Sequence, residues 1–143
     1  MAQIQGEIII DRPVETVFDF VANQCNEPLY NVEMVSAEKM SEGPVGSGTR
    51  FRAVMRSGRR VFPVDIEFTT FERSTRLGSH SVANGMTMDG ELAFEAVGES
   101  TRMTWEWDVH PAGAMRLLSP IVTMIGKRQE DRIWSALKLH LES

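Results

Sequence analysis

Alternation of apolar and polar residues with a period of two constrains this chain more than any other feature of its sequence. The clearest case is TRMTWEWDVH at residues 101–110, where Met103, Trp105 and Trp107 fall on one side and polar side chains fall on the other. Strict alternation predicts a β-strand with one buried face. Four earlier segments alternate in the same way: residues 49–56, 61–72, 76–83 and 86–97.

Short turn sequences connect these predicted strands. The segments SGRR at 57–60, NG at 84–85 and GES at 98–100 each separate two alternating stretches. An Asn-Gly pair in this position is a strong signal for a two-residue hairpin. The Gly-, Pro- and Ser-rich residues 41–48 predict a longer turn. Because hairpin links join antiparallel neighbours, the pattern predicts an antiparallel sheet.

The residues before this sheet predict short helices between two further strands. A helix is expected at residues 11–22, with Asp11 as its cap and Pro13 at its first position. The break after it has room for a second short helix that starts near Pro28. The two flanking strands are expected at residues 3–10 and 32–40.

A long amphipathic helix is expected from about Ala114 to Leu141, and Pro120 can split off its first turn. When residues are placed at about 100° steps, Gln129 falls within the apolar stripe and Glu130 on the opposite, polar side. The predicted apolar stripe contains Met115, Leu118, Ile121, Val122, Ile125, Ile133, Ala136 and Leu137.

A sheet with one apolar face and one long amphipathic helix can bury both surfaces by curling around the helix. The sequence therefore predicts an α+β fold: a curved seven-stranded antiparallel sheet wrapped around a long C-terminal helix, with two short helices after the first strand. At 143 residues, the whole chain (1–143) is expected to form one domain.

Composition narrows the function classes. A net charge of −5 with interspersed acids argues against nucleic-acid binding, which requires a basic stripe. Three scattered histidines have no metal-ligand spacing, so no metal is expected. The Gly-rich residues 43–48 lack the Lys-Ser/Thr ending of a P-loop, and no cofactor is expected. The single cysteine, Cys25, fits a reducing cytoplasm. We expect no signal peptide, no integral membrane association, and a monomer or weak homodimer.

The element order and several local patterns resemble the helix-grip (SRPBCC, START-like) superfamily, in particular its bacterial polyketide cyclase/dehydrase and lipid-transport branch. EIIIDRPVETVFDFVAN at 7–23 resembles its opening strand and helix, and GPVGSGTRFR at 43–52 its Gly-rich turn into the third strand. Three later segments, at 68–77, 98–113 and 135–143, resemble its fourth-to-fifth strand link, last strand and closing helix. The resemblance implies the same fold, and this scaffold serves binding, transport and catalysis alike.

Small inward residues predict open space between the sheet and the helix. If Leu77 points inward, Ser79 and Ser81 do so as well, and small side chains on a concave wall leave room. The alternative is that large side chains from the helices fill that space. The expected ligand-binding residues are Tyr30, Phe51, Met55, Phe62, Val64, Ser79, Ser81, Met86, Met88, Trp105, Leu118, Val122, Ile125 and Gln129.

Several residues expected on the inner side have two interpretations. Trp105 and Trp107 can belong to a solid core or to a pocket wall. Gln129 can bond to the sheet backbone or orient a ligand. Tyr30 can bind or gate at a pocket entrance, or pack with its hydroxyl in water.

The function predicted from these residues is binding or transport of a small hydrophobic or amphipathic molecule, such as a lipid, polyketide or aromatic metabolite. The alternative is a polyketide cyclase/dehydratase-type enzyme that uses the same cavity and needs an inward acid/base pair, which the sequence does not reveal. A third possibility is a partner-binding module that uses the long helix. An inward carboxylate or histidine with a shifted pKa would favour the enzyme.

Overall fold

The computed structural model describes residues 2–143, apart from the side chain of Met115. The strands are β1 (Ala2–Ile10), β2 (Met34–Lys39), β3 (Arg50–Ser57), β4 (Arg60–Glu72), β5 (Arg76–Ala83), β6 (Met86–Val97) and β7 (Ser100–His110). The helices are α1 (Val14–Ala22) and α2 (Ser119–Glu142), with two 3-10 helices, η1 (Gln24–Leu29) and η2 (Gly113–Leu118).

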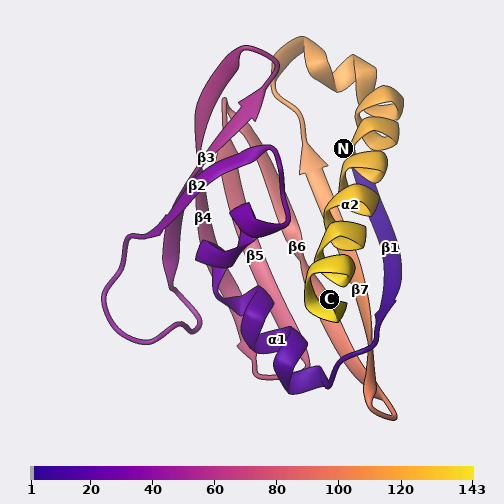
Figure 1. The fold of residues 1–143 in the computed structure, drawn as a ribbon. Coiled ribbons are helices and arrows are strands. Elements are labelled where there is room, and N and C mark those ends of the chain that lie inside the picture. Colours follow the sequence, from indigo (N-terminus) through magenta and orange to yellow (C-terminus); the bar gives the residue numbers. More distant parts are fainter. Residues whose placement is uncertain (1) are drawn as a thin grey trace.

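All seven strands belong to one antiparallel sheet with the order β1-β7-β6-β5-β4-β3-β2. The first and last strands are therefore neighbours, and β2 forms the far edge. The helices α1 and α2 lie on the same face of the sheet, with α2 running along β1 (Figure 1). This arrangement confirms the predicted α+β fold, in which a seven-stranded sheet curves around the C-terminal helix with two short helices after the first strand.

Two helix starts differ from the sequence prediction. Pro13, and not Asp11, is the N-cap residue of α1, and no side chain caps that helix. Asp11 is used elsewhere: its backbone N–H donates to Glu142, and its carboxylate accepts from Ser100. The second short helix begins before the predicted Pro28, because the side chain of Asn23 caps η1 through the Cys25 backbone N–H.

The C-terminal half of α2 packs into a solid core with α1 and the sheet. Leu137 is fully buried, and Trp134 is 4% exposed. From α1, Phe18 makes edge-to-face contacts with Phe71 and Phe94, with ring centroids 5.4 and 5.0 Å apart. Such contacts add to the burial of large apolar surfaces. This part of the inner face is therefore filled by the chain itself.

The two halves of α2 turn their apolar residues in different directions, which the single predicted stripe did not capture. In the C-terminal half Ile133 is buried, whereas in the N-terminal half Ile121 and Ile125 are 48% and 57% exposed. Near the middle Gly126 lies against β1, where an added Cβ would come 2.3 Å from the Ile4 side chain. Met115, also assigned to the stripe, has a side chain outside the described part of the chain. The correct inward side of α2 includes Glu130, which the prediction placed on the polar side.

Candidate functional site

The predicted binding residues of the sheet share its inner face. Residues that pair directly across antiparallel strands point to the same side. Ser79 pairs with Phe68, which is 1% exposed, and Ser81 pairs with Ile66, which is 8% exposed. The other predicted residues of the sheet connect to these through the same register: Phe51, Met55, Phe62, Val64, Met86, Met88 and Trp105.

Burial falls along the inner face of β3 to β6 toward one end, but not along β7, where Val109 at that end is 5% exposed. On β3, Phe51 is 1% exposed, whereas Met55, four residues further on, is only partly buried. On β6, Phe94 is 5% exposed and Met86 is 37% exposed. We call the less buried region the open half of the inner face. It consists of Met55, Phe62, Val64, Ser79, Ser81, Met86 and Met88 on the sheet, with Leu118, Val122 and Ile125 on the helix side.

The helix side shows the same change. In the C-terminal half of α2, Trp134 and Leu137 are buried, but in the N-terminal half Val122 is only partly buried. Leu118, at the end of η2, is 43% exposed and Ile125 is 57% exposed. The side chains of the protein therefore do not cover the open half completely.

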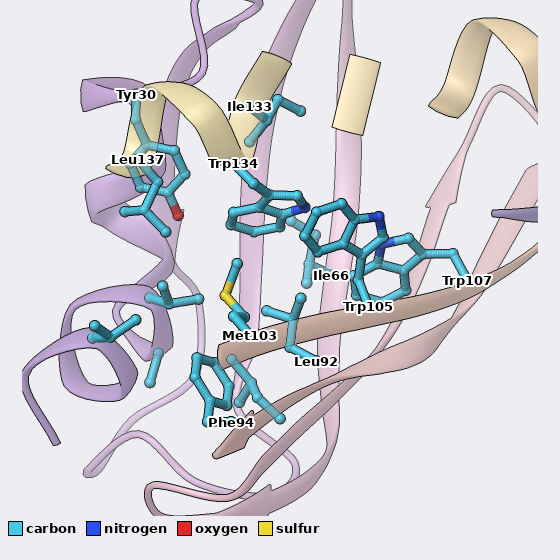
Figure 2. Packing of buried hydrophobic residues seen from close by; sticks show 14 of the residues in the cluster. Tyr30, Ile66, Leu92, Phe94, Met103, Trp105, Trp107, Ile133, Trp134 and Leu137 are labelled. Carbon is cyan, nitrogen blue, oxygen red and sulfur yellow. The ribbon is translucent and has the colours of Figure 1, made fainter. Parts of the chain in front are cut away.

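Tyr30 and Gln129 occupy specific polar positions. Tyr30, next to η1, is 4% exposed, and its ring lies 6.0 Å from that of Trp134, so it is a packed tyrosine (Figure 2). Gln129 donates through Nε2 to the Glu33 carboxylate at 2.9 Å. This bond is not to the sheet backbone, because it joins α2 to the side chain of Glu33 in the segment that leads into β2; a role of Gln129 in orienting a ligand stays a prediction.

Two indoles bind a carboxylate at the boundary between the packed core and the open half, and a third indole packs against one of them. Trp107 on β7 donates through Nε1 to Glu130 Oε1 at 2.5 Å. Trp134, one turn further along α2, donates to the same oxygen at 3.2 Å. Trp105 packs against Trp134 with ring centroids 6.0 Å apart, and the three rings gather in one part of the interior (Figure 2). Glu130 Oε2 accepts from neither indole.

The environment shifts the protonation of Glu130. Burial raises the pKa of the Glu130 carboxyl from 4.5 to about 7, and the nearby carboxylate of Glu27 adds to this rise. The two indole hydrogen bonds act in the opposite direction but do not cancel it. Burial also raises the pKa of Glu27 itself, against hydrogen bonds from Asn31 and Gln24. Both carboxyl groups are therefore unusually easy to protonate.

Tyr30 belongs to the same group. Burial raises the pKa of its phenol well above 10, and the negative charges of Glu27 and Glu130 raise it further. Tyr30 therefore remains a neutral hydroxyl at ordinary pH. Trp105, which is 3% exposed, is an interior side chain whose Nε1 is buried without a hydrogen-bond partner among the described residues. An unpaired buried donor has a free-energy cost of about 1–3 kcal/mol.

Sequence reasoning missed Glu130, Glu27 and Trp134. A helical wheel drawn over the whole of α2 averaged two halves that face different ways, and this placed Glu130 outside. A wheel centred on Ile133, Trp134 and Leu137 alone would have put Glu130 on their side. Glu27 had no such signal, because a six-residue 3-10 helix has too little periodicity to define a face.

Two hollows lie on the opposite face of the sheet. One, of about 360 Å³, is lined by Gly78, Gly90 and charged side chains that include Arg76, Glu91 and Glu106. Charged walls of this kind do not suit an apolar ligand. Within the described residues, His, Cys, Asp and Glu side chains form no cluster that could hold a metal ion. None of the described helices combines the length and apolarity that crossing a bilayer requires.

A curved antiparallel sheet around a C-terminal helix, with a partly open apolar inner face, defines the helix-grip class of proteins. The chain belongs to the family described as "Polyketide cyclase / dehydrase and lipid transport", whose family model matches residues 1–142. A search of curated proteins gave no match.

Solved structures share this fold at low sequence identity. A START superfamily protein from Mycobacterium smegmatis has a TM-score of 0.83 at 13% identity, covering 99% of this chain and 98% of its own. The Zhui aromatase/cyclase from Streptomyces sp. R1128 has a TM-score of 0.80 at 12% identity, covering 98% and 93%. A protein from Thermus thermophilus has a TM-score of 0.79 at 19% identity, covering 99% of each chain.

Proposed function

We propose that this protein binds a small apolar or amphipathic molecule in the open half of the inner face, between the sheet and the N-terminal half of α2. The observation that carries the proposal is the incomplete burial of apolar side chains at this end of both elements, such as Met86 on β6 at 37% and Ile125 on α2 at 57% exposure. Apolar surface that faces a core direction yet stays exposed is stabilised when a ligand removes it from water.

The composition of the open half supports an apolar ligand with few polar contacts. Met55, Met86 and Met88 are flexible side chains that adapt to ligands of varied shape. Ser79 and Ser81 add two hydroxyls on the neighbouring strand, enough to orient a polar group. Lipid transport is part of the family description, which agrees with such a ligand.

Binding is tested with the uncharged fluorescent probe N-phenyl-1-naphthylamine. Wild-type protein is expected to bind it, and Met86→Glu to weaken the Kd about tenfold, because a carboxylate on the wall resists desolvation. Val82→Glu is the matched control: Val82 is equally exposed, at 37%, but pairs with Asp65 on the opposite face. Its Kd should remain that of the wild type.

Two results would contradict ligand binding. One is an equal loss of affinity in both variants. The other is a set of negative results taken together. The probe, fatty acids and aromatic compounds would neither bind nor raise the melting temperature, and native mass spectrometry would find no co-purified molecule.

A second candidate function, catalysis, is favoured by one specific observation: Glu130 points inward with a pKa of about 7. A carboxyl with this pKa can take up and return a proton near neutral pH. Neutral Tyr30, which lies beside Trp134, would supply a hydroxyl in the same region. The family description includes cyclase and dehydrase proteins, whose chemistry needs such proton transfers.

Proton abstraction is tested with 5-nitrobenzisoxazole, an apolar ring that opens to a coloured cyanophenolate when a base removes its C–H proton and the N–O bond breaks. The rate is expected to rise with pH through an apparent pKa of about 7. Glu130→Gln should abolish that rise. A rate no greater than in buffer, or one that persists in Glu130→Gln, would remove the support for catalysis while leaving ligand binding intact.

A further inference from the structure

One end of the molecule combines exposed apolar side chains with basic ones. The register places the β3–β4 turn, the β5–β6 turn and the segment after β7 at the same end of the sheet, and η2 lies there too (Figure 1). We call this surface the basic end and define it as residues 56–61, 84–86 and 110–121. Its exposed large apolar side chains are Val61, Met86, Leu117, Leu118 and Ile121, at 56%, 37%, 86%, 43% and 48% exposure.

The charge of the basic end is opposite to that of the whole protein. Its residue ranges contain four arginines, Arg56, Arg59, Arg60 and Arg116, and no Asp or Glu, in a chain whose net charge is −5. Glu33 lies beside Arg56, but its carboxylate is bonded to Gln129 and Arg132. All four side chains are exposed, and none takes part in an ion pair among the described residues. The positive charges of these arginines are therefore not neutralised by ion pairs within the protein, and they lie at the same end as the exposed apolar side chains.

We propose that the basic end docks on the surface of a bilayer that contains anionic lipids. Apolar side chains such as Leu117 and Ile121 would enter the boundary between headgroups and acyl chains, and the arginines would pair with lipid phosphates. Met86 and Leu118 belong both to this surface and to the open half of the inner face. A molecule leaving the bilayer would therefore reach that half without crossing water.

A second copy of this chain fits the surface less well. In a twofold dimer formed through the basic end, Arg59, Arg60 and Arg116 would face the same arginines of the other copy. Like charges brought together in this way oppose association. An anionic surface instead neutralises all of them.

Co-sedimentation with vesicles tests the docking. The protein is expected to bind vesicles of equal parts phosphatidylglycerol and phosphatidylcholine, to bind phosphatidylcholine vesicles much less, and to lose binding as salt is added. Arg59→Gln combined with Arg60→Gln should reduce binding to the anionic vesicles about tenfold, and Leu117→Ser should reduce it severalfold. These exposed positions lie outside the proposed ligand-binding residues, so the affinity for N-phenyl-1-naphthylamine should not change.

Matched variants elsewhere complete the experiment. Leu139→Ser, at a residue 74% exposed near the C-terminus of α2, and Arg50→Gln, at the far end of β3, should leave vesicle binding unchanged. Equal binding to both kinds of vesicle, or equal losses in the control variants, would overturn the proposal. The proposal would also be overturned if the protein failed to bind vesicles and formed a dimer in sedimentation velocity that Leu117→Ser dissociated. Loss of probe binding alone would affect only the proposed ligand site.

Discussion

Replacing Glu130 by glutamine is expected to change the stability of the protein in a pH-dependent way. The variant should gain stability relative to the wild type as the pH rises. The carboxyl of Glu130 has a folded-state pKa of about 7, above its usual value of 4.5. Between these values the folded state holds a proton that the unfolded state has released. The free energy of unfolding of the wild type therefore falls as pH rises from about 4.5 to about 7, and then stays level.

Glutamine has no proton to lose, but its carbonyl oxygen can still accept from Trp107 and Trp134. The stability of Glu130→Gln minus that of the wild type should therefore increase by up to about 3 kcal/mol between about pH 5 and about pH 8. The raised pKa of Glu27 acts in the same direction in both proteins, and the difference between them reports Glu130 together with its interaction with Glu27.

Urea unfolding followed by tryptophan fluorescence measures this difference across the pH range. Glu38→Gln, at an exposed position on β2, is the control and should follow the wild type at each pH. A difference between Glu130→Gln and the wild type that does not change with pH would show that Glu130 titrates as an ordinary exposed carboxyl.

Gly90→Ala is expected to lower the free energy of unfolding by about 3 kcal/mol or more. Gly90 has φ +153°, and an added Cβ would lie 1.9 Å from the carbonyl oxygen of Glu106 and 2.9 Å from Trp107 Cε3. The backbone of β7 cannot yield as the end of a flexible side chain can. The strand would have to move, and with it the indole that donates to Glu130.

Gly98→Ala separates this clash from the general cost of replacing a glycine. Gly98 also has a positive φ, +63°, but open space surrounds the position of its Cβ. Its substitution should cost only about 1 kcal/mol. Chemical denaturation of both variants measures the comparison, and similar losses for the two would mean that the sheet accommodates a methyl group at Gly90.

The sheet was predictable because each strand carries its own signal. The alternation through Trp105 and Trp107 and the turn at 84–85 depend only on neighbours in the sequence, and the structure places β5 and β6 at the predicted bounds. The inward position of Ser79 and Ser81 followed from the same period of two. Capping by Asp11 failed because its carboxylate accepts instead from a residue distant in sequence, Ser100.

The site was less predictable, because its polar centre combines distant elements. Glu130 becomes a raised-pKa carboxyl only when β7 supplies Trp107 and η1 brings Glu27 near. No local pattern encodes those neighbours. The predicted binding residues lie on the inner face and at the N-terminal half of α2, and their part in ligand binding stays a prediction until the probe experiment is done.

The sequence by itself determined the strands, their antiparallel order of connection and the amphipathic C-terminal helix, because periodicity and turn chemistry act over a few residues. Only the tertiary structure decided which side of α2 faces inward, where the core ends and the open half begins, and which carboxyl changes its pKa. Those properties depend on burial and on charges brought together from opposite ends of the chain, and neither exists until the sheet has closed around the helix.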